Sequence, residues 1–446
     1  MAVHQAVRTP VFTGPAGWAA ILPPAATRAP LAGRAGCDVA IVGGGFAGLS
    51  AARRLLQIDP AMRVVLLDAK RISEGGAGRN SGFMIDLPHD LTSADYAGSH
   101  PSQDLTRLNR AAIDFAAEAV RDYAIPSGYL QRSGKINGAA SDAGMAANAS
   151  YARHLSDLGE PHELLDARTM HKVTGSRYYR GGLFTPGTAM LQPAGYVQGL
   201  AAGLERAGVT IHENSPVLEF ASNAQGWALR TPEGGLQAQR VILGNNGHLE
   251  SFGFKAGRLM HIMLNACMTE ELPPEAVAAL GGRECWGVTP ADPMGTTVRR
   301  IGPAQGGHRI VIRQGGAYRP DMQASAGDLA RATRHMRQKF DARFPMLAGL
   351  RFEHRWSGHL CLSKNGVSVM RELEPGLYAA CVQNGLGTAR GTLTGIGAAE
   401  LACGQQSAIT RFFTAEAEPA RLPPHPFDTI GANAYLRWKE WQSRLE

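Results

Sequence analysis

The chain has 446 residues, of which 44% are hydrophobic and 19% are charged. This composition excludes disorder of the whole chain and supplies apolar material for two or three domains. The net charge of +7 is spread along the chain without a basic stripe, so nucleic-acid binding is not expected.

The predicted elements begin with an arm over residues 1–36, which is rich in Ala, Pro and Gly. We expect this arm to lie on the surface and to be pinned by Trp18. Residues 37–42 and 64–67 are short apolar runs typical of buried strands, and a helical pattern over 49–59 lies between them. Apolar strands that alternate with a helix predict a parallel β-α-β unit.

The rest of the chain mixes helical and strand patterns. Alternation between about 250 and 320 predicts an antiparallel sheet. The aromatic spacing at the C-terminus predicts an amphipathic helix that docks on the body through Tyr435, Trp438, Trp441 and Leu445. We expect helices over 101–125, 143–158, 196–207 and 326–341, and strands over 209–211, 217–218, 241–243, 309–313 and 377–382.

The sequence pattern predicts neither a targeting signal nor a metal site. The N-terminus lacks the apolar region of a signal peptide, and no run of about 20 apolar residues predicts an integral membrane segment. The six cysteines show no CxxC spacing, so we expect no metal site and a cytoplasmic protein with reduced thiols.

A glycine motif connects the first apolar strand to its helix. It reads Gly43-Gly44-Gly45-Phe46-Ala47-Gly48. The first glycine permits a tight turn, the third lets a pyrophosphate approach the backbone, and the last lets the helix pack closely. Asp68 ends the next strand, where an acid accepts hydrogen bonds from a ribose. The motif predicts a dinucleotide on the helix N-terminus, and a β-α-β unit without a ligand is the alternative.

Two later glycine segments favour FAD over NAD. The loop Gly75-Gly76-Ala77-Gly78-Arg79-Asn80-Ser81-Gly82-Phe83 carries a cation and hydrogen-bonding side chains suited to a ribityl-phosphate, although an ordinary surface loop is the alternative. The stretch Asn384-Gly385-Leu386-Gly387-Thr388-Ala389-Arg390-Gly391 leads into a late helix. A helix N-terminus aimed at the flavin ring would stabilise its anionic reduced form, and a nicotinamide enzyme has no need of it.

In these features the chain resembles the FAD-dependent D-amino acid oxidase superfamily, which includes glycine and sarcosine oxidases. Within it, the chain is most similar to the gamma-glutamylputrescine oxidoreductase-like branch. The resemblance spans roughly residues 18–445. It is carried by Asp38 to Gly48, Asp68, Gly78 to Gly82, Pro193, Val217, Trp356-Ser357-Gly358 and the Gly385 turn.

The resemblance implies an α/β fold in which discontinuous segments assemble a Rossmann-like FAD-binding domain of the glutathione-reductase type. An antiparallel β-sheet with helices would form the substrate domain. The expected division is the arm at 1–36, the FAD-binding domain at 37–95, 165–248 and 350–410, the substrate domain at 96–164 and 249–349, and a C-terminal extension with the amphipathic helix at 411–446.

The resemblance also implies contacts with FAD. The backbone at Val217 would touch the adenine. The whole implied set is Gly43, Gly45, Phe46, Ala47, Gly48, Asp68, Ala69, Lys70, Gly78, Arg79, Asn80, Ser81, Val217, Gly385, Leu386, Gly387 and Thr388.

On the substrate side, Arg313, Tyr318 and Arg390 lie where relatives face the flavin. An arginine there would hold a carboxylate or sulfonate with two parallel hydrogen bonds, while a structural role is the alternative for each. The implied reaction oxidises the C–N bond of a small amine or amino acid. A hydride passes to flavin N5, the imine product hydrolyses to a carbonyl, and O2 or another acceptor takes the electrons.

Three other functions stay open. Arg313 stands where sarcosine oxidases hold a lysine, which favours a dehydrogenase that passes electrons to a quinone or a partner protein. Some relatives are flavin domains in RNA-base modification, but this chain has neither a basic stripe nor a fused second catalytic domain. The chain could also be a non-catalytic nucleotide-binding module.

Some residues depart from the family pattern. Ser363-Lys364-Asn365 stands where many relatives carry Thr-x-Asp. The amine-oxidising branch often has Asn in the last of these positions, which favours that branch. Cys361 is out of register with the flavin-linking cysteine of sarcosine oxidases, so we expect non-covalent FAD, and we expect His359 to be structural. Gly134-Lys135-Ile136 resembles a P-loop end, but Ile136 cannot bind magnesium.

Overall fold

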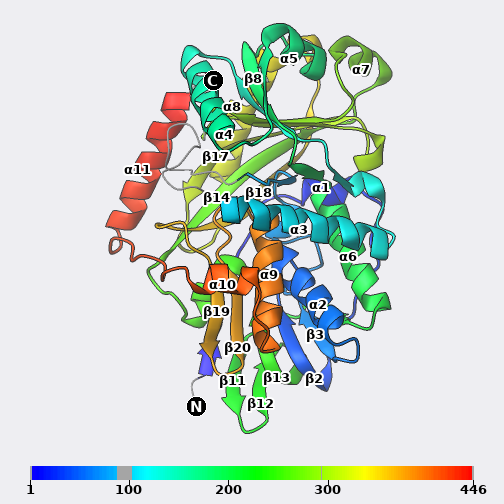
Figure 1. Ribbon diagram of the computed structural model, residues 1–446, viewed down its shortest axis with the longest axis vertical. Coiled ribbons are helices and arrows are strands. Elements are labelled where there is room, and N and C mark those ends of the chain that lie inside the picture. The colour runs from blue at the N-terminus through cyan, green and yellow to red at the C-terminus, as the bar shows by residue number, and fades with distance from the viewer. Residues whose placement is uncertain (1–2, 88–102, 293, 444–445) are drawn as a thin grey trace.

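A computed structural model describes residues 3–87, 103–292, 294–443 and 446. The expected boundary between residues 95 and 96, the first two residues of the expected helix 101–125, and Leu445 lie outside these described residues. Within them, the chain forms two large β-sheets flanked by helices (Figure 1). None of the helices described here combines the length and the apolarity needed to cross a bilayer.

A nine-stranded sheet forms the lower half of the molecule in Figure 1. Its parallel centre joins β2 to β3 on one side and to β13 on the other, and β20 pairs parallel with β13. These strands are apolar because both faces are covered. The strands are β1 (Val3–Gln5), β2 (Gly33–Val42), β3 (Val64–Leu67), β10 (Thr210–His212), β11 (Glu219–Asn223), β12 (Gly226–Arg230), β13 (Gly234–Leu243), β19 (Val369–Glu374) and β20 (Leu377–Cys381).

Helices α2 and α9 lie side by side on one face of this sheet (Figure 1). Their apolar sides share a core with the sheet, through residues such as Ile41, Leu55 and Leu393. The helices on this side are α2 (Phe46–Ile58), α3 (Gln103–Asp122), α6 (Pro193–Arg206), α9 (Ala389–Ala402) and α10 (Ala408–Thr414).

An eight-stranded sheet forms the other half, in the order β18-β14-β17-β16-β15-β6-β8-β7. Its strands are β6 (Lys135–Ala139), β7 (Glu163–Asp166), β8 (Gly181–Thr185), β14 (Leu259–Thr269), β15 (Trp286–Pro290), β16 (Thr297–Ile301), β17 (Arg309–Tyr318) and β18 (Phe352–Ser363). Its other elements are α1 (Gly17–Ala20), α4 (Asp142–Asp157), α5 (Ala167–Thr174), α7 (Pro274–Leu280), α8 (Ala326–Arg343) and α11 (Phe427–Gln442). A small sheet joins β4 (Phe83–Met84), β5 (Leu130–Gln131) and β9 (Ala189–Leu191).

Sheet membership corrects two of the expected domain ranges. Strand β8 lies within 165–248, yet it pairs with β6 and β7 in the eight-stranded sheet. Strand β18 lies within 350–410, yet it pairs with β14 along most of its length. Both ranges were assigned to the FAD-binding domain. Apolar runs in sequence do not show which distant strand they pair with, which is why these boundaries were missed.

The N-terminal arm is more integrated than expected. Trp18 is fully buried and its Nε1 donates to the carbonyl oxygen of Asn80 at 2.8 Å, as the pinning role requires. However, β1 pairs with β11, and Gly33–Val42 already forms β2. The expected strand at 217–218 is wrong, because these residues link β10 to β11.

The C-terminal helix also differs from expectation. Its aromatic side does not dock on the body: Tyr435, Trp438 and Trp441 are 50%, 49% and 59% exposed. Helix α11 instead attaches to β17 through polar side chains.

Candidate FAD and substrate site

The first glycine turn leaves the N-terminus of α2 open. Gly43 has a φ of 106°, the left-handed conformation that the tight turn requires. A Cβ on Gly48 would lie 1.9 Å from the carbonyl oxygen of Gly43, which explains the need for glycine there. A Cβ on Gly45 would meet only the Cβ of Ala77, at 3.6 Å. Helix α2 has no side-chain cap and no acid in its first turn, so its free N–H groups suit a pyrophosphate.

Asp68 lies beside this turn. Its Oδ2 accepts a hydrogen bond from the Gly44 N–H at 2.7 Å, and its Oδ1 accepts one from the Lys70 N–H at 2.8 Å. Burial raises the pKa of Asp68 to about 6. The Ser215 N–H donates to the carbonyl oxygen of Asp68 at 2.8 Å, which brings the segment before Val217 to the same edge. Remaining lone pairs on the carboxylate fit a ribose diol.

The second glycine segment follows β3, and hydrogen bonds from other parts of the chain hold it in place. A Cβ on Gly78 would lie 1.8 Å from the carbonyl oxygen of Ser73. The carbonyl oxygens of Asn80 and Ser81 accept hydrogen bonds from Trp18 and Arg299. These contacts fix the loop close to Gly45, since Ala77 belongs to the same segment.

Arg79 does not offer its guanidinium as a free cation. Its nitrogens donate to the carbonyl oxygens of Glu74 at 2.7 Å, Gly14 at 3.1 Å and Ser357 at 3.1 Å. The guanidinium also lies 4.7 Å from the ring centroid of Phe12. Burial lowers its pKa to about 10. Arg79 therefore ties the loop to the N-terminal arm and to β18.

The third glycine segment meets the first two. The Thr388 hydroxyl donates to the carbonyl oxygen of Phe83 at 2.7 Å, next to the second segment. A Cβ on Gly391, in the first turn of α9, would lie 3.2 Å from the Cβ of Phe46 at the start of α2. A Cβ on Gly387 would meet no atom within 4 Å among the described residues. Helix α9 also lacks a side-chain cap, so two open helix N-termini share one site.

One face of the eight-stranded sheet covers this site. The Trp356 Nε1 donates to the carbonyl oxygen of Arg79 at 3.0 Å. Residues directly opposite in an antiparallel pair point to the same face. Ala266 is opposite both Trp356 and Arg313, so Arg313 lies on the covering face. Gly358 is on this face too, because it lies two residues after Trp356 in the same strand and pairs with Leu264, two residues before Ala266.

The side chains of the other two expected substrate residues, Tyr318 and Arg390, bond to other groups of the protein. The Tyr318 hydroxyl donates to Asp428 Oδ2 at 2.9 Å, and burial together with this bond raises the tyrosine pKa. Arg390 donates to the carbonyl oxygen of Gly366 at 2.8 Å and pairs with Glu416 at 3.2 Å. These contacts hold Tyr318 against α11 and fix Arg390 in the first turn of α9.

His359 and Cys361 of β18 lie on the opposite face, because each is an odd number of residues from Trp356. His359 Nε2 and His261 Nδ1 are 3.0 Å apart, and His261 Nε2 is 2.7 Å from Glu250 Oε2. Burial and the neighbouring His261 lower the pKa of His359 to about 3, so it is neutral. Cys361 is fully buried in the core beneath the nine-stranded sheet.

A polar group that the sequence pattern did not single out lies on the covering face. Lys135 Nζ donates to Asn137 Oδ1 and to the Thr289 hydroxyl, the latter at 3.5 Å. The Thr289 hydroxyl donates to Asn137 Oδ1 at 2.8 Å. Burial lowers the pKa of Lys135 to about 8. Alternation in Lys135-Ile136-Asn137 was the available signal, because it places both polar side chains on one face of β6.

Comparisons with known proteins agree with this geometry. The chain is 26% identical over 400 residues to gamma-glutamylputrescine oxidoreductase of Escherichia coli (strain K12), covering 88% of each chain. It is 24% identical over 442 residues to the probable oxidoreductase OrdL of Rhizobium meliloti (strain 1021), covering 96% of each. The fold matches glycine oxidase from Geobacillus kaustophilus with a TM-score of 0.70 at 19% identity, covering 86% of this chain and 100% of that one.

The family assignment rests on a model that describes most of the chain. That model, of the FAD dependent oxidoreductases (DAO), matches residues 38–401, which include all three glycine segments and Arg313. The chain therefore belongs to the FAD dependent oxidoreductase family.

Proposed function

We propose that this protein binds FAD non-covalently and oxidises the C–N bond of an amine or amino acid, giving an imine that hydrolyses to a carbonyl. The main support for this proposal is that the three glycine segments meet beneath the covering face of the eight-stranded sheet, which carries Trp356. When bound, FAD supplies the redox chemistry by accepting a hydride at N5. The names of the relatives, an amine oxidoreductase and a glycine oxidase, support the substrate class.

In this proposal the turn residues hold the cofactor. The open N-terminus of α2 at Gly45 takes the pyrophosphate, and Asp68 takes the adenosine ribose. The N-terminus of α9 at Thr388 places its positive end beside the flavin ring and stabilises negative charge there. Of the remaining positions implied by the resemblance, Ala69 and Lys70 directly follow Asp68, Val217 lies two residues after Ser215, and the others belong to the three glycine segments.

Non-covalent attachment is supported by the cysteines. Gly358 occupies the covering face of β18 nearest to Arg79, and it has no side chain to bond to a flavin. Cys361 points into the opposite core. All six cysteines are unpaired, which supports a reducing cytoplasmic location.

On the substrate side, we assign Arg313 to a carboxylate of the substrate because it lies on the covering face. Lys135, Asn137 and Thr289 extend the polar surface of the same face toward β6. Tyr318 and Arg390 act as positioning residues, since each is engaged with the protein.

An anaerobic titration of the purified protein with amines and amino acids tests the proposal. We expect the visible flavin band to bleach with one class of compound. A yellow protein that no amine or amino acid bleaches would overturn the substrate class, and a colourless protein unable to take up FAD would overturn the whole proposal. Readmitting air separates an oxidase, which recolours fast, from a dehydrogenase that needs a quinone or a partner protein.

A further inference from the structure

Helix α11 is attached to the body by its polar side. Strand β16 pairs only with Arg309–Arg313 of β17, so the following residues of β17 have an open edge. The Gly316 N–H donates to Glu440 Oε1 at 3.2 Å, and the Tyr318 N–H donates to Asn433 Oδ1 at 3.0 Å. Helix α11 thus caps this edge, and it runs along the outside of the molecule in Figure 1.

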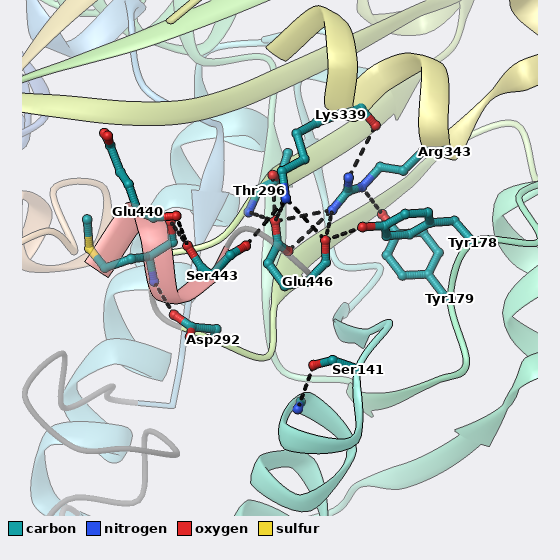
Figure 2. Close-up of polar contacts among 12 residues, drawn as sticks. Ser141, Tyr178, Tyr179, Asp292, Thr296, Lys339, Arg343, Glu440, Ser443 and Glu446 are labelled. Carbon is teal, nitrogen blue, oxygen red and sulfur yellow. Dashed lines mark hydrogen bonds and ion pairs between the residues drawn. The ribbon is translucent and has the colours of Figure 1, made fainter. Parts of the chain in front are cut away.

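Glu446 forms a second set of contacts that hold this region to the body. Glu446 Oε1 accepts hydrogen bonds from the Thr296 N–H at 3.0 Å and the Thr296 hydroxyl at 2.7 Å (Figure 2). Glu446 Oε2 pairs with the fully buried guanidinium of Arg343 at 3.2 Å, and Tyr178 donates to its carbonyl oxygen. Polar contacts therefore hold both α11 and Glu446 to the body.

That apolar side faces outward. Phe427, Ile430, Tyr435 and Trp438 are 68%, 64%, 50% and 49% exposed. At about 100° per residue their positions fall on one side of the helix. No residue of α11 is buried. A continuous strip of large apolar side chains on the surface marks a binding face.

Charge indicates what this face binds. The acids of α11 point away from the apolar strip: Asp428 is bonded to Tyr318, and Glu440 pairs with Arg437 at 3.1 Å and with Arg331 of α8 at 3.6 Å. Arg437 and Lys439 flank the apolar strip on its two sides, and Lys439 Nζ lies 5.3 Å from the Trp438 ring centroid. Aromatic side chains between basic flanks are typical of helices that lie in a lipid interface.

We propose that the outer face of α11 binds the anionic surface of a lipid bilayer. The aromatic side chains enter the boundary between headgroups and acyl chains, while Lys439 beside Trp438 contacts an anionic headgroup, and the net charge of +7 attracts the protein to the surface. A second copy of the chain fits this face less well, because a symmetric contact would place basic flanks of two molecules with net charge +7 side by side.

Vesicle flotation of the flavin-loaded protein tests the proposal. We expect it to float with vesicles of phosphatidylcholine and phosphatidylglycerol but not with phosphatidylcholine alone, and salt should weaken the binding. Trp438→Ser and Lys439→Glu should each weaken binding about tenfold. Leu164→Ser and Arg168→Glu are matched controls, because both residues are exposed on β7 and α5, outside α11, and they should bind as the unmodified protein does.

Tryptophan quenching by brominated anionic lipids needs no variant. Four of the six tryptophans are at most 3% exposed, whereas Trp438 and Trp441 are about half exposed. We expect quenching of this exposed pair alone. No flotation with anionic vesicles, or equal loss in Leu164→Ser and Trp438→Ser, would overturn the proposal. A dimer in solution that Trp438→Ser dissociates would overturn it in favour of a second copy.

Discussion

Gly45 and Gly48 belong to one turn, yet adding a side chain has opposite consequences at the two positions. Gly45 has extended backbone angles, φ −91° and ψ −167°, and a Cβ there would meet only the Cβ of Ala77, at an ordinary contact distance of 3.6 Å. Gly48 has a backbone oxygen where its Cβ would be. One glycine is thus kept for a ligand and the other for packing of α2 against the turn.

The contrast gives a prediction. Gly45→Val should fold with an unfolding midpoint near that of the flavin-free unmodified protein, and it should purify without FAD because the side chain fills the pyrophosphate position. Absorbance in the visible band and thermal unfolding measure both effects. Gly48→Ala is the control and should lose stability. Full flavin content in Gly45→Val would contradict the assigned site.

Asp68 gives a prediction about pH. Its raised pKa, about 6 in the folded protein against 3.8, means that the folded state holds a proton that the unfolded state has lost. Stability of the flavin-free protein therefore falls as pH rises from about 4 to 6, by up to about 1.4 kcal/mol per pH unit. Asp68→Asn should lack this slope. Denaturant unfolding at several pH values measures it, and parallel slopes in both proteins would contradict the buried, perturbed carboxyl.

At the scale of elements, hydrogen-bond partners separate the two substrate-side candidates on β17. Strand register places Arg313, opposite Ala266, and Tyr318, opposite Ile262, on the same covering face, but the Tyr318 hydroxyl is bonded to Asp428 of α11. Arg313→Met should raise KM for amino acids about tenfold or more, because a charged hydrogen bond is lost, and should spare amines without a carboxylate. Steady-state kinetics on both substrate classes measure this. An equal effect on both classes would contradict a carboxylate-binding role.

Tyr318→Phe provides the matched comparison on the same strand. It removes the bond to Asp428 and should speed hydrogen exchange in α11 while leaving KM unchanged. A fall in kcat with unchanged exchange would instead make Tyr318 catalytic.

The elements also show what sequence can and cannot predict. The strands at 37–42 and 64–67 and the glycine turn between them were predicted because each depends on neighbouring residues, and the structure confirms them. The sheet partners of β8 and β18 were missed because pairing joins residues far apart in sequence. The alternation of Lys135 and Asn137 was visible in the sequence, but their partner Thr289 comes from another strand, so the polar group as a whole was missed.

At the scale of the whole molecule, the proposed FAD site joins parts of the chain that are otherwise separate. One wall comes from the nine-stranded sheet through α2 and α9, and the other from the eight-stranded sheet through Trp356. A ligand that binds only this assembled state stabilises it by mass action, by about 2.7 kcal/mol at a concentration one hundred times its Kd. FAD should therefore raise the unfolding temperature of the flavin-free protein by a few degrees, in proportion to the logarithm of its concentration. Differential scanning calorimetry across an FAD titration measures the shift. Gly45→Val should show no shift, while Arg313→Met, which alters only the substrate side, should show the full one. If FAD stabilised Gly45→Val as well, the ligand would be binding outside the glycine segments, and the site described here would not be the one that holds it.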